Sequence, residues 1–421
     1  MRKFIVSGGK KLEGEISVQG AKNSVLPVIA AATLCDGNVI IKNAPDISDT
    51  YFALQILNHL GAKTTFTANE NTIAIDSTGV RESEIPDKLM KKIRSSIFFL
   101  GAILGRTGRC RISQPGGCDI GLRPIDMHIS ALKQMGVKVI HEEEHLDFIA
   151  DKGITGAKIN LVFPSVGATE NIIMAAVTAV GTTIISNAAR EPEVVDLVKF
   201  LNAAGAKIKT DASGRIIIKG VPKLTGCEFK IMPDRIAAAT YLACAASTGG
   251  MVTIRDCNTF DLDPILPIFT AAGCKVYTYD TSVTLSAGKK LTSPHSLIKT
   301  LVHPGFPTDA QAVIMGMLTR AEGVTVFEET IFENRYRHVP ELTKFGADII
   351  VSGKIAVVTG VPKLHAAKAE STDLRGGAGI ITAALAAEGR SEISLIEYID
   401  RGYEDFEGNL KRLGAEIQRS S

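Results

Sequence analysis

The sequence predicts an α/β fold made of six copies of one βαβαββ repeat, and three observations lead to this prediction. A glycine that ends a helix recurs about every 70 residues, and strand and helix patterns follow the same order between these glycines. One helix of most repeats is apolar on nearly every side. At 421 residues the chain exceeds the size at which one hydrophobic core keeps growing. We therefore expect two domains of three repeats each.

The recurring glycine follows the last helical turn of each repeat, as in Leu60-Gly61-Ala62-Lys63. At this C′ position helices commonly end in a left-handed backbone conformation. Glycine adopts that conformation without a steric penalty. The expected C′ glycines are Gly61, Gly136, Gly205, Gly273, Gly346 and Gly414.

The first repeat gives the order of the elements. Alternating apolar and polar residues predict strands, and apolar residues at helical spacing predict helices. Ser48 or Asp49 is expected to cap the second helix. In chain order the expected elements are strand 15–19, helix 24–34, strand 38–42, helix 49–60, and strands 63–67 and 72–76, and the stretches 158–219 and 228–286 repeat this order closely.

The first helix of most repeats has no polar face, as in 171–180 and 236–246. A helix that is apolar all round is buried rather than laid on a surface. The helices are therefore expected inside and the sheets outside, which is an inside-out α/β barrel.

The composition excludes several function classes. A net charge of +2 gives no overall attraction to nucleic acid or to an anionic membrane, so a positive site must be local. No segment approaches the ~18 apolar residues of a membrane span, and the stretch 1–9 reads as a strand and a turn. The seven cysteines are scattered and never spaced Cys-x-x-Cys, which disfavours disulfides and zinc and favours a reducing cytoplasm.

A glycine-rich loop over 114–124 places Cys118 near Arg111 and Arg123 in the sequence. Cationic neighbours favour the thiolate and can bind an anion. Cys244, in contrast, lies in an apolar run and is expected to pack. An incidental cysteine in a surface turn is the alternative reading of the loop.

Small, polar or charged residues stand at the start of the first helix in all six repeats. Helix N-termini attract phosphate and carboxylate groups, so Lys22, Arg94 and Arg375 are candidates to bind an anionic substrate. The alternative is structural, because Asp and Thr are good N-caps. A cation such as Lys22 opposes the helix dipole, and we therefore expect an anion beside it.

With these residues in place, the chain resembles the UDP-N-acetylglucosamine 1-carboxyvinyltransferase family, the enolpyruvyl transferases that use UDP-N-acetylglucosamine. The resemblance covers essentially the full length and rests on several ordered motifs. They are Gly20-Ala21-Lys22-Asn23, Pro115-Gly116-Gly117-Cys118, Arg123-Pro124-Ile125-Asp126-Met127-His128, Ser165-Val166-Gly167-Ala168-Thr169, Ala188-Ala189-Arg190-Glu191-Pro192-Glu193, Phe306-Pro307-Thr308-Asp309, Phe332-Glu333-Asn334-Arg335, Thr372-Asp373-Leu374-Arg375 and Asp400-Arg401-Gly402-Tyr403-Glu404.

The resemblance implies a discontinuous domain of residues 1–21 plus 233–421 and a second domain of residues 22–232 that carries the loop 114–124, with the active site between them. It implies transfer of enolpyruvyl from phosphoenolpyruvate to the 3′-hydroxyl of UDP-N-acetylglucosamine, with release of phosphate, as the first committed step of peptidoglycan synthesis. The implied enzyme is a cytoplasmic monomer that serves cell-wall growth, cell shape and division. It needs no cofactor, metal, nucleic acid or membrane.

The resemblance also implies roles for individual residues. Cys118 would donate a proton, could form a thioketal adduct with pyruvate, and would be the target of fosfomycin-like epoxides. Asp309 would act as base on the sugar hydroxyl or hold it in place. Lys22, Asn23, Arg123 and Arg401 would bind phosphoenolpyruvate, and Lys22 would also be a catalytic residue. The implied nucleotide-sugar contacts are Arg94, Arg123, Pro124, Ile125, Asp126, Met127, Ser165, Val166, Gly167, Asp309 and Ile331, and Asp373 and Arg375 are tied to closure and turnover.

One position departs from the family pattern, because Phe163 stands where many members have a lysine that contacts the nucleotide. Two motif segments are read as structural: His128 as a helix-face residue, and Arg190-Glu191-Pro192-Glu193 as a helix start. Three other functions stay open. They are 3-phosphoshikimate 1-carboxyvinyltransferase, which has no equivalent cysteine loop, RNA 3′-phosphate cyclisation on the same repeat fold, and a non-catalytic nucleotide-sugar-binding regulatory paralogue.

Overall fold

The computed structural model describes residues 2–113, 125–288 and 290–420. These residues form two compact units. Unit 1 contains 2–19 together with the described residues of 233–420, and unit 2 contains 20–113 and 125–232. Each unit has a hydrophobic core of its own.

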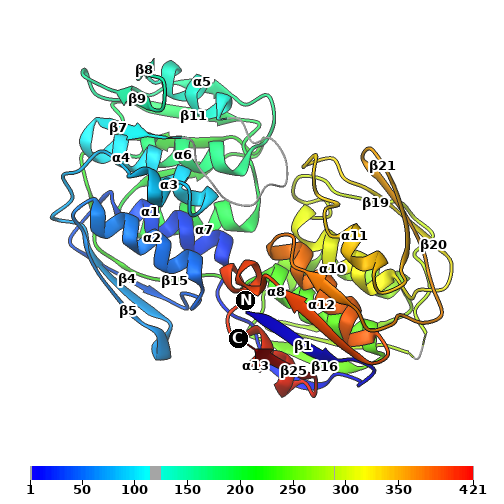
Figure 1. The fold of residues 1–421 in the computed structure, drawn as a ribbon. Coiled ribbons are helices and arrows are strands. Elements are labelled where there is room, and N and C mark those ends of the chain that lie inside the picture. The colour runs from blue at the N-terminus through cyan, green and yellow to red at the C-terminus, as the bar shows by residue number, and fades with distance from the viewer. Residues whose placement is uncertain (1, 114–124, 289, 421) are drawn as a thin grey trace. The chain divides into compact units, whose positions relative to one another are not determined.

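Three buried helices form the centre of unit 1: α8 (Arg235–Thr248), α10 (Thr308–Leu318) and α12 (Leu374–Ala386). They pack against one another, and nearly all of their residues are buried. In Figure 1 the strands of this unit lie on the outside of these helices. Helices inside and sheets outside is the arrangement that the apolar helices predict.

Each sheet of unit 1 has four strands. One pair of neighbouring strands in each sheet is parallel, and the other pairs are antiparallel. The shorter helices of this unit are η3 (Thr259–Leu262), α9 (Leu266–Ala271), α11 (Val339–Thr343), η4 (Ile396–Arg401) and α13 (Phe406–Arg412). The sheets run β17 (Lys275–Tyr279), β18 (Ser282–Ser286), β16 (Met251–Arg255), β2 (Glu13–Ser17); β19 (Ile298–Lys299), β20 (Val324–Glu328), β22 (Ile355–Thr359), β21 (Asp348–Ser352); and β23 (Lys368–Glu370), β24 (Arg390–Ser394), β1 (Lys3–Ser7), β25 (Glu416–Ser420).

Unit 2 is built in the same way around α1 (Lys22–Ala32), α4 (Phe99–Thr107) and α6 (Val166–Ala176). Helix α4 packs against α6 so closely that a Cβ on Gly101 would lie 2.2 Å from the carbonyl oxygen of Asn171. Only glycine fits there, because the obstacle is backbone. The other helices are η1 (Ala68–Glu70), α2 (Ser48–His59), α3 (Asp87–Met90), η2 (Arg94–Phe98), α5 (Asp126–Gln134) and α7 (Pro192–Ala203).

The sheets of unit 2 depart from the regular repeat at one place. The first strand of the second repeat is reduced to a single bridge between Glu84 and Arg111, so its sheet has three strands. The sheets run β15 (Glu228–Lys230), β4 (Asn38–Lys42), β6 (Thr72–Asp76), β5 (Lys63–Thr67); β10 (Lys158–Asn160), β11 (Thr182–Ser186), β13 (Ile216–Lys219), β12 (Lys207–Thr210); β7 (Arg109–Ile112), β9 (Leu146–Ile149), β8 (Lys138–His141); and the pair β14 (Leu224–Thr225), β3 (Cys35–Asp36).

The chain passes between the units because two repeats exchange their first strands. Strand β2 begins the first repeat but pairs in parallel with β16 of the fourth. Strand β15 begins the fourth repeat but pairs in parallel with β4 of the first. The N-terminal strand β1 completes the sheet of the last repeat between β24 and β25. The two chain ends consequently lie side by side in Figure 1.

The local predictions are largely confirmed. All six expected C′ glycines have a positive φ, between 86° and 104°. Strands β4, β5 and β6 have the expected bounds. Strand β2 and helix α1 each begin two residues earlier than expected, because the ladder to β16 starts at Glu13 and Ala21 forms the extended N-cap of α1.

The predicted cap of α2 is wrong. The helix begins at Ser48, its N-cap is Ile47, and no side chain caps it. Asp49 lies in the first helical turn instead, where its carboxylate pairs with Lys22. An ion pair to a residue distant in sequence therefore took the place of the local hydrogen bond that the sequence pattern suggested.

Candidate active-site residues

Lys22 opens helix α1 of unit 2 and has its anionic partner inside the protein. Its Nζ lies 2.8 Å from Oδ2 of Asp49, and the two side chains are 11% and 1% exposed. A cation at a helix N-terminus opposes the helix dipole, and the carboxylate of Asp49 is the neighbouring anion that offsets this unfavourable interaction. The next residue, Asn23, is exposed. The start of α1 thus combines a buried, charge-balanced lysine with an accessible amide.

The start of α1 is also tied to helix α7. The Oγ of Ser24 donates to Oδ2 of Asp196, and the same oxygen accepts the backbone N–H of Met232 at 3.2 Å. Burial raises the pKa of Asp196, although these two hydrogen bonds oppose the shift. The position of Lys22 and Asn23 is therefore fixed by both neighbouring helices, α2 and α7.

A second group of predicted residues lies at the starts of η2, α5 and α6, and these three elements belong together because η2 and α5 both pack on α6. Arg94 begins η2, and burial lowers the pKa of its guanidinium. Ile125 is the N-cap of α5, and Asp126 and Met127 form its first turn. Ser165 caps α6 by accepting the N–H of Ala168 at 3.3 Å.

The predicted residues Val166 and Gly167 lie directly beside this cap, in the first turn of α6. A Cβ on Gly167 would lie 3.5 Å from ring atoms of both His128 and Phe98, which come from α5 and η2. His128 is buried, and burial, together with the charge of Arg94, lowers its pKa to about 4. His128 is therefore neutral at pH 7 and packs against α6, in agreement with its expected structural role.

The predicted base, Asp309, lies at the start of α10 in unit 1 and is held by two arginines. Nη2 of Arg335 is 2.9 Å from Oδ1, and Nη2 of Arg375 is 3.4 Å from Oδ2. The aspartate side chain is 27% exposed, whereas each arginine is only 3% exposed. The carboxylate is thus accessible on one side and oriented from the other.

Arg335 is fixed by further contacts to α10. Its Nε and Nη2 donate to the carbonyl oxygen of Thr308 at 3.3 and 3.0 Å. A guanidinium forms such a fork with several fixed donors, which a lysine cannot reproduce. Arg335 thus joins the first turn of α10 to the carboxylate that follows it.

Glu329 holds the predicted contact residue Ile331 in place. The carboxylate is buried, and its Oε1 accepts the N–H groups of Ile331 at 2.8 Å and of Phe332 at 3.1 Å. Its Oε2 accepts the hydroxyl of Thr308 at 3.0 Å. The loop after β20 and the start of α10 are therefore bound to the same carboxylate.

Arg375 lies over the ring of Tyr403, 5.3 Å from its centroid. The Tyr403 hydroxyl is hydrogen-bonded to Thr240 at 2.9 Å. The amide of Gln19 holds the same segment, because it donates to Gly402 at 3.1 Å and accepts from Glu404 at 2.7 Å. Arg401, predicted to bind phosphoenolpyruvate, ends η4 directly before this segment.

Asp373 is the N-cap of α12 and accepts the N–H groups of Arg375 at 3.0 Å and Gly376 at 3.1 Å. Burial opposes its ionisation, but Arg335, these N–H groups and His338 outweigh burial and lower its pKa. Asp373 therefore has a clear structural task in addition to any role in turnover.

Comparison with known proteins agrees with this description. The sequence pattern of the family described as EPSP synthase (3-phosphoshikimate 1-carboxyvinyltransferase) matches residues 6–410. UDP-N-acetylglucosamine 1-carboxyvinyltransferase 2 of Caldanaerobacter subterraneus is 45% identical over the whole of both chains. UDP-N-acetylglucosamine 1-carboxyvinyltransferase 1 of Clostridium acetobutylicum is 44% identical, also over the whole of both chains. This chain belongs to the UDP-N-acetylglucosamine 1-carboxyvinyltransferase family.

A further member, from Finegoldia magna, is 43% identical over 97% of this chain and 96% of its own. Solved structures confirm the fold of this family for the chain. The enolpyruvyl transferase NikO from Streptomyces tendae superposes with a TM-score of 0.90 at 24% identity, over 100% of this chain and 99% of its own. EPSP synthase from Acinetobacter baumannii gives 0.76 at 18% identity, over 100% of both chains.

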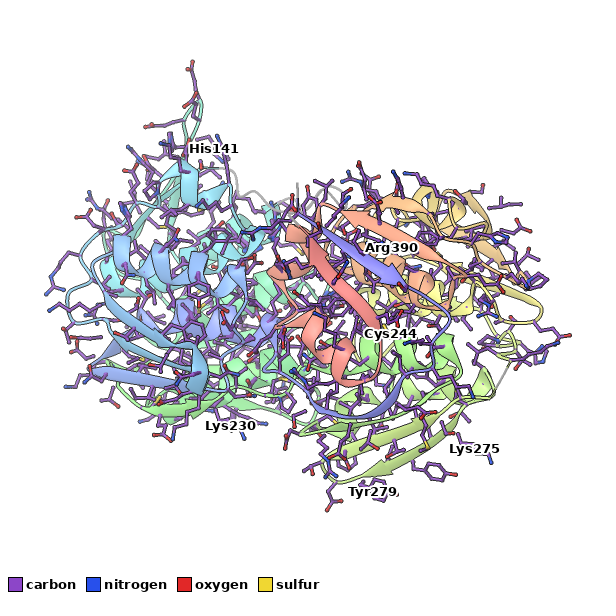
Figure 2. The ribbon with its side chains drawn as sticks, turned by 60° about the horizontal axis from the view of Figure 1, so that its bottom comes forward. His141, Lys230, Cys244, Lys275, Tyr279 and Arg390 are labelled. Carbon is purple, nitrogen blue, oxygen red and sulfur yellow. The ribbon has the colours of Figure 1, made fainter. Side chains whose placement is uncertain are left out.

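Three residues that the family resemblance singles out, Cys118, Arg123 and Pro124, lie outside the described residues. Five of the six other cysteines are buried, and Cys227 is half-buried. Burial raises the pKa of Cys244, which lies in α8 and is labelled in Figure 2, to about 12. These thiols stay protonated and pack, as the sequence suggested for Cys244.

No role was predicted for Arg335, Glu329 or Gln19, and Asp49 was predicted only to cap a helix. Arg335 lies in a quoted family motif, so a signal existed for it. Glu329, Gln19 and Asp49 are single polar residues outside any motif. Gln19 and Asp49 bind partners far away in sequence, whereas Glu329 binds the loop that follows it. Phe163, the departure from the family pattern, is 41% exposed, and its carbonyl oxygen accepts the N–H of Ser165 at 2.7 Å.

Within the part of the chain that is described, no group of three or more His, Cys, Asp or Glu side chains could hold a metal ion. No helix among the described residues has the length and apolar character needed to cross a membrane.

Proposed function

We propose that this chain transfers the enolpyruvyl group of phosphoenolpyruvate to the 3′-hydroxyl of UDP-N-acetylglucosamine and releases phosphate. The observation that carries the proposal is its identity of 43–45% to enzymes of that name along essentially the whole chain. In a cell the product would enter peptidoglycan synthesis, and the enzyme would work as a monomer in the cytoplasm.

The reaction consists of an addition followed by an elimination. In the addition, the methylene carbon of phosphoenolpyruvate gains a proton, the sugar oxygen bonds to the adjacent carbon, and the hydroxyl proton passes to a base. The product is a tetrahedral ketal that still carries the phosphate. In the elimination, the methyl carbon loses a proton, the carbon–oxygen bond to phosphate breaks, and the double bond forms again.

Asp309 is proposed as the group that accepts the hydroxyl proton or holds the hydroxyl for attack. The clamp of Arg335 and Arg375 supports this role, because it fixes the carboxylate while leaving one side exposed. A general base must lie within hydrogen-bonding reach of its proton and keep its orientation. Ile331, fixed through Glu329, is proposed to contact the same nucleotide sugar.

Cys118 is proposed as the proton donor to the methylene carbon, and its thiolate could also add to phosphoenolpyruvate to give the thioketal adduct. Lys22, Arg123 and Arg401 are proposed to bind the phosphate and carboxylate of phosphoenolpyruvate, with Asn23 beside the reacting carbon. Cationic side chains stabilise negative charge that develops on a substrate.

The nucleotide is proposed to bind at the starts of η2, α5 and α6. Arg94 would contact the diphosphate, and Arg123 to Met127 and Ser165 to Gly167 would contact the rest of the nucleotide sugar. Support comes from the packing of η2 and α5 on α6 and from the affinity of helix N-termini for phosphate. Asp373 and Arg375 are proposed to act in closure around the substrates and in turnover, and residues 1–21 with 233–421 and 22–232 are proposed as the two domains.

The test is a phosphate-release assay with phosphoenolpyruvate and one acceptor at a time. Release with UDP-N-acetylglucosamine alone supports the proposal. Release with 3-phosphoshikimate alone would show that this chain uses the acceptor named in the description of the matching family. Binding of the nucleotide sugar without release by either acceptor would indicate a regulatory paralogue. Asp309→Asn is the matched inactive control, because it keeps the shape but not the charge.

A further inference from the structure

The outer face of one sheet in unit 2 carries four lysines and no carboxylate. The sheet runs β10-β11-β13-β12. Its core face is formed by buried isoleucines such as Ile159, Ile185 and Ile218. Because side chains alternate along a strand, the neighbouring residues point outward. The outward lysines, all exposed, are Lys158, Lys207, Lys209 and Lys219, and we call them the lysine face.

The strand register brings these lysines together. Lys207 of β12 lies directly opposite Lys219 of β13. Lys158 and Lys209 occupy the two ends of one row that crosses the sheet through Ile184 and Ile217. Like charges directly opposite each other destabilise a sheet. The fold thus maintains an arrangement that costs stability.

The other five large sheets differ, because each carries an ion pair among its outward residues. The pairs are Lys42 with Glu228, Arg111 with Asp147, Arg255 with Glu15, Lys299 with Glu328, and Lys3 with Glu392. No lysine of the lysine face forms an ion pair with any residue that the structure describes. The nearby hairpin adds no net charge, because its Asp211 is paired with Arg215.

We propose that the lysine face docks the enzyme reversibly on a membrane surface that contains acidic phospholipids. Clusters of four or more basic residues are attracted to such surfaces at moderate salt. Charge complementarity is the first reason for this assignment, because the face offers four positive charges without a counter-charge. The proposal concerns a surface and not a membrane span, and it is independent of the catalytic proposal.

The chemistry of the face favours a lipid surface over other anionic partners. Lysine is a flexible point charge, whereas specific recognition of carboxylate or phosphate commonly uses the arginine fork, and this sheet has no outward arginine within its strands. Its strands also carry no aromatic residue on which a nucleic-acid base could stack.

Apolar side chains between the lysines fit the same partner. Ile184 and Ile217 are half-buried in the middle of the face, and Val180, two residues before Thr182 and in phase with the outer face, is 74% exposed. A sheet face with apolar residues between lysines can lie on a bilayer, with the ammonium groups at the headgroups.

Sedimentation with lipid vesicles tests the proposal. We compare vesicles of phosphatidylcholine with vesicles that also contain phosphatidylglycerol, at low and at high salt. The wild type is expected to sediment only with the acidic vesicles, and less so as salt rises, because salt screens exposed charges. Replacing Lys158, Lys207, Lys209 and Lys219 by Gln is expected to lower the partition coefficient by roughly tenfold or more.

A second variant with the same change in net charge is the control. It replaces Lys42, Lys63, Lys275 and Lys368 by Gln, one or two from each of three other sheets; Lys275 is labelled in Figure 2. This variant is expected to bind acidic vesicles like the wild type. Both variants are expected to keep wild-type transferase activity, and the lysine-face variant is expected to unfold at or above the wild-type temperature, because Lys207 and Lys219 no longer repel each other.

The proposal is overturned if the lysine-face variant binds like the wild type, or if the control variant loses as much binding. It is also overturned if the wild type binds poly-glutamate more tightly than acidic vesicles, which would assign the face to an acidic protein partner. Loss of vesicle binding with unchanged phosphate release supports it and leaves the proposed function untouched.

Discussion

Asp309 takes its orientation from two arginines that are themselves almost completely buried. Each arginine reaches a different carboxylate oxygen, and Arg335 is in turn anchored to the backbone of Thr308. A carboxylate held in this way loses little further entropy when it meets a hydroxyl group. The positions of the neighbours therefore matter as much as the presence of the aspartate.

Replacing Arg335 tests this dependence. Arg335→Lys keeps a positive charge but cannot bond to the Thr308 carbonyl and the Asp309 carboxylate at once, so we expect kcat to fall by roughly 10- to 100-fold with a smaller change in KM. Arg335→Ala is expected to lower kcat further than Arg335→Lys does. It should also move the acidic limb of the pH–rate profile to higher pH, because a neighbouring cation is gone. Steady-state kinetics over a range of pH measures both effects.

Arg337→Lys is the control, since it makes the same exchange two residues away. Two outcomes would contradict the positioning role. Arg335→Lys could lose activity only in proportion to a loss of folded protein, or the pH profile of Arg335→Ala could stay where it is in the wild type.

Glu170 of α6 is a buried carboxyl group whose two oxygens have no hydrogen-bond partner among the described residues. Burial raises its pKa well above the usual value, and the charges of Glu193 and Glu191 add to this shift. The folded protein therefore holds a proton that the unfolded chain releases above about pH 4.5. The contribution of Glu170 to the stability of the wild type therefore falls as pH rises from there to the pKa of the folded state.

Glu170→Gln removes this proton linkage. We expect the variant to equal the wild type in unfolding free energy near pH 4 and to gain on it by about 1.4 kcal/mol per pH unit above about pH 4.5, until the folded-state pKa is reached. Urea unfolding at several pH values measures the difference. The exposed Glu143→Gln should show no such trend. A difference for Glu170→Gln that stays constant with pH would show that the side chain is ionised in the folded state.

Cys118 offers a test of the proposed proton transfer. Cys118→Ala is expected to abolish transfer at neutral pH, and an epoxide phosphonate is expected to alkylate the wild-type thiol and inactivate the enzyme. Cys118→Asp should keep some activity and escape alkylation, because a carboxylic acid can donate a proton but reacts poorly with the epoxide. Mass spectrometry and phosphate release follow the two effects. Full activity of Cys118→Ala would remove Cys118 from the mechanism.

At the scale of elements, the inner helices owe their close packing to glycines. A Cβ on Gly316 of α10 would lie 2.4 Å from the carbonyl oxygen of Gly379 in α12. The obstacle is backbone, so the helices would have to move apart. The two glycines therefore set the separation of α10 and α12, and with it the place of Asp309 relative to Arg375.

Gly316→Ala is consequently expected to destabilise unit 1 by about 1–3 kcal/mol, despite the higher helix propensity of alanine. Gly408→Ala in α13 is the matched control. The three atoms nearest to its Cβ would all belong to the carboxylate of Asp405, the first at 2.0 Å, and this side chain can rotate away, so we expect a change within about 1 kcal/mol. Denaturant unfolding compares the two variants. Equal effects would mean that the helices have room to adjust.

The sequence predicted these elements well where the signal was local. The C′ glycines and strands β4 to β6 depend on residues that are neighbours in the chain. It could not show that the first strand of the second repeat is only a bridge at Glu84, because strand length depends on the partner strand. It also missed the pair of Lys22 with Asp49, since the cap pattern around Asp49 competes with a contact that only the fold creates.

The residues of the candidate site could be predicted where a family motif marks them, and not elsewhere. Family motifs pointed to Lys22, Asp309, Arg375 and the Ser165 turn, and the structure brings Asp309 and Arg375 into contact. The supporting carboxylate of Glu329 and the amide of Gln19 carry no motif of their own. Their roles arise from buried hydrogen bonds to backbone groups, which a single sequence does not display.

At the scale of the whole molecule, the exchange of first strands lets one continuous segment of the chain form unit 2 by itself. Every member of the unit 2 core lies between Ala21 and Ile231, and all strands of its sheets lie in the same segment. Unit 1, in contrast, needs two separate stretches, because β1 and β2 join sheets whose other strands come after residue 250.

We therefore expect residues 20–232, produced alone, to fold with a cooperative thermal transition, because their core and sheets are complete. Residues 233–421 alone should not fold, since they lack the strand between β24 and β25 and the edge strand beside β16. Joining 2–19 behind residue 421 through a short linker should restore folding, because Lys3 lies opposite Ser420 in the sheet. Circular dichroism and calorimetry compare the three chains. Cooperative folding of 233–421 without the added strands would show that β1 and β2 are dispensable for the folding of unit 1.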